Sequence, residues 1–225
     1  MNKEYQGDIS AISSNELMKD TELMNKVIVV KRTKNIDDLT KIQLLMRKYF
    51  KPHEIVSSNE FLYYVENYNK LYEGEDYFVY KIEQDDMLIG MMSGVKLNEF
   101  VVVDYFIIDA PYRRSSKEIA NKVIDVLKEF NRPVVVEAES EVLCRLYQMF
   151  GFKRFREPYK YFMLDVCLQS KTSKVSSYDS NLLYLSPNDM DFEDTRHTLY
   201  NKHYMRWNSI YGDELTKEYK TALDL

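Results

Sequence analysis

The segment from residue 100 to residue 138 constrains the fold more than any other part of the chain. It contains FVVVDYFIIDA at 100–110, an apolar stripe at helical spacing from Ser116 to Phe130, and VVVEA at 134–138. Two apolar strands that flank such a helix must form a parallel crossover in one sheet. Alternation along the first strand predicts one face with Val101, Val103, Tyr105 and Ile107 and another with Val102, Asp104, Phe106 and Ile108.

The elements around this crossover extend the sheet. A strand is expected at 26–32, helices near 37–50 and 58–73, and a hairpin from 77–83 and 87–97. After the crossover, Ser140 caps a helix that ends at Gly151, and two further strands follow. The order β-α-α-β-β-β-α-β-α-β-β predicts an α/β fold: a central mixed sheet of about seven strands with helices on both faces.

Charge and the distribution of apolar residues divide the chain into three parts. Residues 26–167 carry 22 basic and 22 acidic side chains and the densest apolar periodicity, so they form the candidate domain. Residues 1–25 form an acidic N-terminal arm. Residues 168–225 begin with the polar stretch SKTSKVSSYDSN, interpreted as a linker to a helical C-terminal extension. Ser186-Pro187 is expected to open a helix with Leu199, His203 and Trp207 along one side.

The C-terminal extension is expected to pack on the domain or on a partner, because neither of its helices can bury an apolar face alone. It is also long enough to reach a second copy of the chain, so a homo-oligomer or an assembly partner is one expectation for 168–225.

Composition argues against several classes of function. The net charge of −5 gives no basic footprint for nucleic acid, and no apolar stretch approaches the length of a membrane span. The two cysteines form no CxxC pair, and His53, His197 and His203 are scattered, which argues against a metal site or a disulfide framework. The N-terminus lacks the apolar region of a signal peptide, so a cytoplasmic location is expected.

Two segments resemble the GNAT acyltransferase superfamily, and the element order is similar to that of its fold. SEVLCRLYQMFGFKRF at 140–155 resembles the family's helix–turn–strand with an LYxxxGF stretch. FIIDAPYRRSSKEIANKVI at 106–124 resembles the strand, phosphate loop and helix that grip coenzyme A. The resemblance covers roughly residues 26–167. It implies acetyl transfer from acetyl-coenzyme A to an amine, with no metal cofactor.

The loop before the helix at 116–130 departs from the family pattern. A helix N-terminus offers free N–H groups and partial positive charge to a pyrophosphate. The resemblance places Ser115 at the usual Arg/Gln position, Glu118 at the first small residue and Ala120 at the second; only Ala120 fits. The residues expected to bind the phosphates are Arg113, Arg114, Ser115, Ser116 and Ala120. Glu118 opposes an anion there, unless it is simply an acid that favours the helix dipole.

Catalytic candidates follow from the same resemblance and from the chemistry of amide formation. By resemblance, Tyr147 protonates the departing thiolate, and the backbone of Phe106, Ile107 and Ile108 pairs with the pantetheine arm. An amine must lose a proton before it attacks, and ligands usually bind at strand ends in parallel crossovers. Glu137 is therefore the first candidate base and Asp104 the second. A covalent route through Cys144 is disfavoured, because a small buried residue is the plainer interpretation.

Two hypotheses follow. The first is an N-acetyltransferase that moves an acetyl group directly to a primary amine of a small molecule or a protein. The second is a catalytically inactive GNAT-fold module for binding or assembly, associated with a virion or another multiprotein particle. The intact LYQMFGF stretch and the paired arginines favour the first hypothesis. The loop without glycine and the aromatic tail favour the second.

Overall fold

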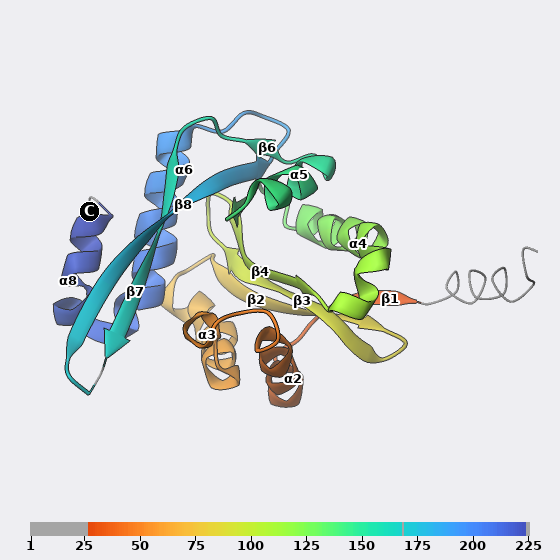
Figure 1. Cartoon of the computed structure of the whole chain (residues 1–225), viewed down its shortest axis with the longest axis horizontal. Helices are drawn as coiled ribbons and strands as arrows, with labels where there is room; N and C mark the ends of the chain where they lie inside the picture. Colours follow the sequence, from red (N-terminus) through yellow and green to blue (C-terminus); the bar gives the residue numbers. More distant parts are fainter. Residues whose placement is uncertain (1–26, 168, 224–225) are drawn as a thin grey trace, which may run out of the picture.

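The computed structural model describes residues 27–167 and 169–223, which fold around an eight-stranded sheet (Figure 1). The strands are β1 Ile28–Arg32, β2 Asp76–Gln84, β3 Met87–Lys96, β4 Val101–Ile108, β5 Val134–Ala138, β6 Lys153–Arg154, β7 Tyr159–Cys167 and β8 Thr172–Leu185. Their order is β1-β2-β3-β4-β5-β8-β6, and β7 pairs with β8 outside this path. The predicted α/β class is confirmed. The N-terminal arm, 1–25, lies outside the described residues.

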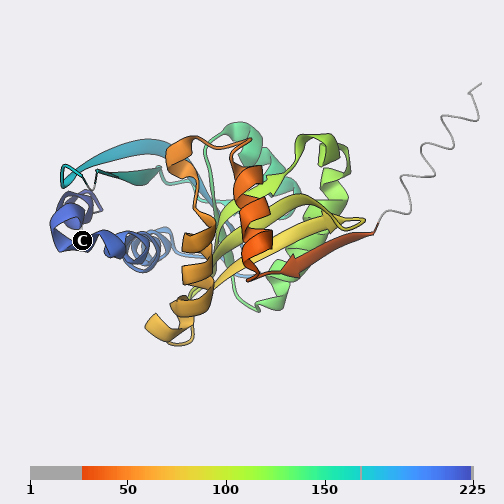
Figure 2. The same cartoon turned by 90° about the horizontal axis from the view of Figure 1, so that it is seen from below.

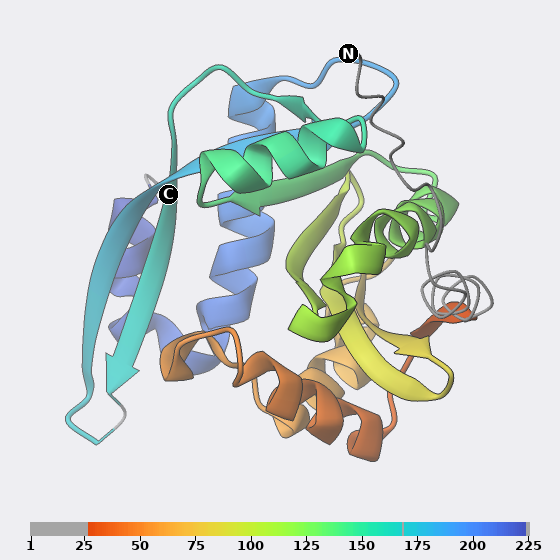
Figure 3. The ribbon, with the colours of Figure 1, turned by 45° about the vertical axis from the view of Figure 1, so that its right-hand side comes forward.

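Helices lie on both faces of the sheet, as predicted. The α-helices are α2 Ile36–Met46, α3 Ser58–Leu71, α4 Ser116–Glu129, α5 Glu141–Met149, α6 Phe192–Thr198, α7 Met205–Asn208 and α8 Gly212–Ala222. The helices α2 and α3 pack on one face together with the C-terminal helices (Figure 2), and we call this the α2–α3 face. The helices α4 and α5 cover the other, the α4–α5 face (Figure 3).

Local signals in the sequence place several helix ends correctly. Asn35 caps α2 by accepting hydrogen bonds from the backbone N–H groups of Asp37 and Asp38. Ser57 and Glu60 form a capping box at the start of α3, and Ser140 caps α5. Gly151, just after α5, has a φ of 90°, the left-handed conformation that glycine adopts most readily.

The predicted parallel crossover is confirmed. Strand β4 pairs in parallel with β5 through Val101–Val103 and Val134–Val136, and α4 connects the two strands. Their valines are buried, which explains why both strands are almost continuously apolar.

The linker prediction for the polar stretch after residue 168 is wrong. Residues Thr172–Leu185 form β8, the longest of the described strands, which pairs with β7 and then with β5 and β6. Its first half forms a two-stranded ribbon with β7 and is largely exposed, so it needs no apolar alternation. Only Leu182–Tyr184, beside β5, is buried. The helix expected from Ser186-Pro187 begins later, at Phe192, because Asp191 caps it.

A β-bulge changes the predicted alternation of β4. Ser93 pairs with Tyr105 and Gly94 with Val103, so Asp104 is an extra residue in the strand. The prediction is correct up to Asp104 and wrong after it. Beyond the bulge, Tyr105 and Ile107 contact the core of the α2–α3 face, whereas Phe106 and Ile108 contact that of the α4–α5 face.

Gly94 is the residue that allows β3 to approach this bulge, and its replacement by alanine should destabilise the protein. A Cβ atom at Gly94 would lie 1.9 Å from the carbonyl oxygen of Val102 and 2.9 Å from the Phe78 ring. Because the first obstacle is backbone, we expect Gly94→Ala to lower the free energy of unfolding by about 3 kcal/mol, the upper range for overpacking. Urea denaturation measures this value.

Gly151→Ala is the matched control, since a Cβ there would meet only Leu185 Cδ1, at 3.7 Å. It should lower stability by about 1 kcal/mol through its positive φ alone. Equal losses in the two variants would contradict the steric role of Gly94.

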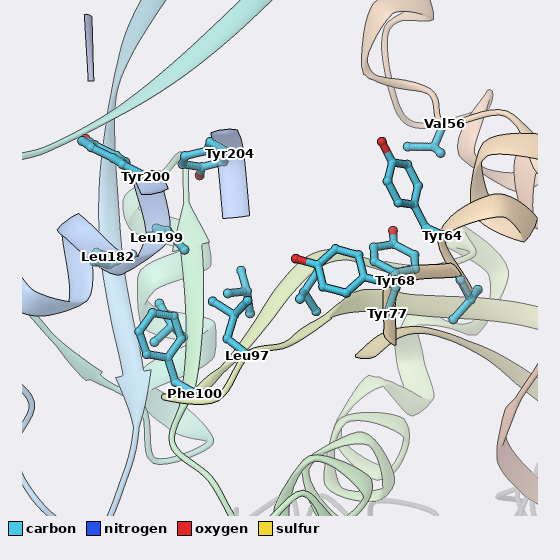
Figure 4. Packing of buried hydrophobic residues seen from close by; sticks show 14 of the residues in the cluster. Val56, Tyr64, Tyr68, Tyr77, Leu97, Phe100, Leu182, Leu199, Tyr200 and Tyr204 are labelled. Atoms are coloured by element: carbon cyan, nitrogen blue, oxygen red, sulfur yellow. The ribbon is translucent and has the colours of Figure 1, made fainter. Parts of the chain in front are cut away.

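Aromatic side chains of the C-terminal extension belong to the same buried core as those of the domain. Figure 4 labels Tyr200 and Tyr204 of the extension and Tyr64, Tyr68 and Tyr77 of the domain in this core. The Trp207 ring stacks on Tyr64 of α3 with 4.2 Å between ring centroids, and the Tyr64 hydroxyl donates to the Trp207 carbonyl at 3.2 Å. In α8, the Tyr219 hydroxyl donates to the carbonyl of Phe162 in β7 at 3.0 Å. The extension therefore packs on its own domain, one of the two expected arrangements.

Candidate active site

The sheet opens between β4 and β5. Hydrogen-bonded pairing of these strands covers only Val101–Val103 and Val134–Val136, and β4 then continues to Ile108 without β5 beside it. Phe106, Ile107 and Ile108 pair with β3 but have no partner strand on the side of β5. The sequence resemblance predicts that their backbone binds the pantetheine arm. The bulge at Asp104 marks the start of the opening.

An apolar pocket lies on the α4–α5 face beside this opening. It is narrow, with a cavity volume of about 20 Å³, and it is partly open to solvent. Its lining comes from β3, β4, β5, the helices α4 and α5, and the residues after α5: Met92, Val103, Phe106, Ala120, Val123, Ile124, Leu127, Val136, Tyr147, Phe150 and Phe152. Three predicted site residues, Phe106, Ala120 and Tyr147, therefore line the same pocket.

Tyr147 is the residue of this lining whose side chain carries a hydroxyl group. Its ring packs against Phe152, with 5.3 Å between centroids. Burial raises the pKa of the Tyr147 hydroxyl to about 12, and this hydroxyl makes no hydrogen bond with the described residues. The group therefore stays protonated at neutral pH and is free to donate its proton to a bound molecule.

The predicted phosphate loop is a short 3₁₀-helix, Ala110–Ser115, that leads directly into α4. The helical backbone thus begins six residues before Ser116. The backbone N–H of Ala110 donates to the Tyr49 hydroxyl at 2.7 Å and to Asp109 at 3.1 Å. The first N–H group of the turn that precedes α4, that of Ala110, is therefore already hydrogen-bonded within the protein.

Arg113 makes contacts within the protein. Its Nε donates to the Ile108 carbonyl at 3.2 Å, and its guanidinium lies 5.0 Å from the centre of the Tyr49 ring. Glu118 is exposed on the first turn of α4. The side chains of Arg114, Ser115 and Ser116 lie outside the described part of the structure.

The two candidate bases lie on the α2–α3 face, opposite the pocket. Asp104 Oδ1 accepts a hydrogen bond from His203 Nε2 at 2.8 Å, and the side chains are 11% and 8% exposed. Glu137 of β5 accepts a short hydrogen bond from the Tyr159 hydroxyl of β7. The Tyr159 and Tyr204 hydroxyl oxygens are 3.4 Å apart.

The charges of this cluster influence one another. Burial raises the pKa of Glu137, and the Tyr159 hydroxyl opposes this rise by stabilising the carboxylate. Burial also disfavours the charged form of His203, but the Asp104 carboxylate outweighs burial and raises the imidazole pKa. Glu137 therefore holds its proton more strongly than an exposed carboxyl, and His203 favours the imidazolium.

The candidate acid, Tyr147, and the candidate bases, Asp104 and Glu137, thus lie on opposite faces of the sheet beside the β4–β5 opening. Val103 and Val136 line the pocket with Tyr147, while the residues that follow them, Asp104 and Glu137, point to the other side. Sequence reasoning selected Tyr147, Asp104 and Glu137 but missed His203, Tyr159 and Tyr204. Only the place of His203 between Leu199 and Trp207 on one helix side signalled that it faces the sheet.

Three other observations limit the chemistry of the described residues. Cys144 is buried, and burial raises the pKa of its thiol, which disfavours it as a nucleophile. No group of three or more His, Cys, Asp or Glu in the described chain is placed to hold a metal ion. Within the same residues, no helix combines the length and apolar character that crossing a bilayer requires.

The described residues thus form a mixed sheet that opens after a bulged strand, with a tyrosine on one side of the opening and carboxyl groups on the other. Residues 41–152 match the profile of the acetyltransferase (GNAT) family. The match and the fold together identify this chain as a member of the GNAT family, which supports acetyl transfer as its general class of activity.

Solved structures share this fold. A putative GNAT-family acetyltransferase from Bacteroides thetaiotaomicron shares 20% identity with a TM-score of 0.58, over 79% of this chain and 98% of that one. A putative GNAT acetyltransferase from Desulfovibrio desulfuricans shares 11% identity with a TM-score of 0.50, over 71% and 99%. No curated protein matches this chain in sequence.

Proposed function

We propose that the protein is an N-acetyltransferase that moves an acetyl group from acetyl-coenzyme A directly to a primary amine. The observation that carries this proposal is the arrangement around the β4–β5 opening. A protonated hydroxyl, Tyr147, lies on one side, and two carboxylates, Asp104 and Glu137, lie on the other. Amide formation from a thioester is assisted by a proton acceptor for the attacking amine and a proton donor for the leaving thiolate.

The reaction proceeds by one exchange of bonds. Glu137 takes a proton from the ammonium form of the acceptor, and the free amine nitrogen then attacks the thioester carbonyl. A C–N bond forms and the C–S bond breaks. The leaving thiolate takes the Tyr147 proton. The attacking nitrogen loses its second proton to water, and the Tyr147 phenolate regains a proton from water, so an amide and coenzyme A are the products. The hydroxyl of Tyr147 suits this step because it is protonated and not engaged by another described group.

Two features fit the pantetheine arm of the co-substrate. The pocket beside Tyr147 is apolar throughout its lining. The edge of β4 from Phe106 to Ile108 has backbone groups available for an added extended chain. The phosphates would lie near Ala110–Ser115, where Arg113 donates to the Ile108 carbonyl through its Nε and offers its terminal guanidinium nitrogens.

Binding of acetyl-coenzyme A should raise the thermal stability of the protein. At a ligand concentration one hundred times the Kd, the expected stabilisation is about 2.7 kcal/mol. Differential scanning fluorimetry over a concentration series measures it. ATP is the matched control ligand, because it carries adenine and phosphates without the pantetheine arm and should stabilise the protein less.

Arg113 donates to the Ile108 carbonyl, and Asp109 accepts from the Tyr49 hydroxyl. Because these contacts lie within the protein, they favour a second candidate function, the non-catalytic GNAT-fold module. A folded protein that shows no stabilisation at millimolar acetyl-coenzyme A would contradict acetyl transfer and leave this module as the function. The acceptor amine and any oligomer formed through 168–225 stay predictions.

A further inference from the structure

The C-terminal extension contributes side chains to the cluster on the α2–α3 face. The helical run from Phe192 to Asn208 contains a π-helical segment, Leu199–Tyr204, between α6 and α7. Such segments are rare and occur frequently at functional sites. Leu199, Tyr200, His203 and Tyr204 are all buried. The wider turn therefore directs two successive side chains, His203 and Tyr204, toward the cluster beside the opening.

His203 and Tyr204 each contact a different candidate base. His203 bonds Asp104 of β4, and Tyr204 lies beside the Tyr159–Glu137 pair of β5 and β7. The charged and titratable groups that face His203 from its own helix and from the strands are Asp104, Glu137, Arg206 and Tyr204. Arg206 is itself paired with the buried carboxylate of Glu75 and packs over the Tyr72 ring.

We infer that His203 is a positioning residue of the active site: its hydrogen bond to Asp104 holds a positively charged imidazole beside Glu137, which acts as the base. This inference rests on the proposed acetyl transfer. Two carboxylates and one imidazolium leave the cluster with one net negative charge. A protonated primary amine is the substrate that neutralises it, so the cluster is complementary to the acceptor in its ammonium form.

A purely structural role for the Asp104–His203 pair is the competing explanation. The pair joins the extension to β4, and a hydrogen bond alone would be sufficient for that. The two explanations differ in what they require of residue 203. Positioning requires a positive charge near Glu137, whereas a structural link requires only a donor to Asp104 in a side chain of suitable size.

Two substitutions of His203 separate these explanations. His203→Gln keeps a donor for Asp104 and removes the charge, and His203→Lys keeps the charge in a different shape. A positive charge beside Glu137 lowers its pKa, so its loss should move the acid limb of the kcat/KM profile upward by about one pH unit. At the foot of that limb, His203→Gln should be about tenfold slower than the wild type. His203→Lys should keep the wild-type limb.

The assay follows release of the coenzyme A thiol with three probe amines: n-butylamine, spermidine and a lysine-containing peptide. Acetyl-coenzyme A binds on the opposite face, so an unchanged thermal stabilisation by it shows that each variant is folded. His197→Gln is the matched control. His197 is exposed on α6, and the same substitution there should leave the profile unchanged.

The outcomes distinguish the inferred role of His203 from the proposed acetyl transfer on which it rests. Suppose that the wild type turns over a probe amine. An unchanged acid limb of the kcat/KM profile in His203→Gln would then overturn the role of His203 alone. A larger loss of kcat/KM in His203→Lys than in His203→Gln would do the same. No turnover of any probe amine by the wild type would overturn the proposed acetyl transfer and the role of His203 with it.

Discussion

Tyr147→Phe should lower kcat by about a hundredfold and change the Kd for acetyl-coenzyme A by less than about twofold. The substitution removes only the hydroxyl, which makes no hydrogen bond with the described residues, so the apolar lining stays intact. Loss of a general acid typically reduces the rate of the chemical step by ~10²–10⁴. Steady-state kinetics measures kcat, and isothermal titration calorimetry measures the Kd.

Tyr178→Phe is the matched control for this experiment, because Tyr178 is exposed on β8 and lies outside the site. It should behave as the wild type in both measurements. If Tyr147→Phe instead weakens affinity and lowers kcat by the same factor, the hydroxyl acts in binding and is not the proton donor.

Glu137→Gln should lower kcat/KM by about a hundredfold or more while leaving the protein as stable as the wild type or slightly more so. Glutamine can still accept the Tyr159 hydrogen bond through its amide oxygen but cannot take a proton from the acceptor. Urea denaturation at pH 7 and initial rates with a probe amine give the two values.

The sign of the stability effect follows from the raised pKa of Glu137. The folded protein binds more protons than the unfolded chain between the usual carboxyl pKa and this raised value. The contribution of Glu137 to stability is therefore greatest in acid and declines as pH rises through that window. At pH 7 glutamine avoids the burial of a charge, so a stabilised variant is expected.

The activity of the wild type should show the reverse dependence. It should fall as the pH drops through the raised pKa, because the protonated carboxyl is no longer a base. Glu139→Gln, at an exposed position two residues further on, is the control and should leave both activity and its pH profile unchanged. Wild-type kcat/KM in Glu137→Gln would assign the base to Asp104 or to another group.

Much of the fold could be predicted because local signals agree with tertiary packing. The crossover through β4, α4 and β5 is apolar at every position that it buries. Caps at Asn35 and Ser140 bind the N–H groups that helix starts leave free. The LYQMFGF stretch led to Tyr147 in the same way, since one short helix and its turn place that side chain.

The features that sequence reasoning missed depend on distant partners. The β4 bulge requires Gly94 on β3 to allow the close approach of Val102. Strand β8 has few apolar residues in its first half, and β7 provides the hydrogen bonds that keep it extended. His203 contacts Asp104 only because the C-terminal extension packs against β4.

The order of the elements along the chain has a consequence for biosynthesis. Strand β8 shields the edge of β5 that faces away from β4, and the π-helical segment follows β8 in sequence. A nascent polypeptide that has emerged from the ribosome only through β7 would leave that edge bare and lack the imidazole beside Asp104. A product that ended after β7 would therefore expose this edge of β5 and be prone to aggregate.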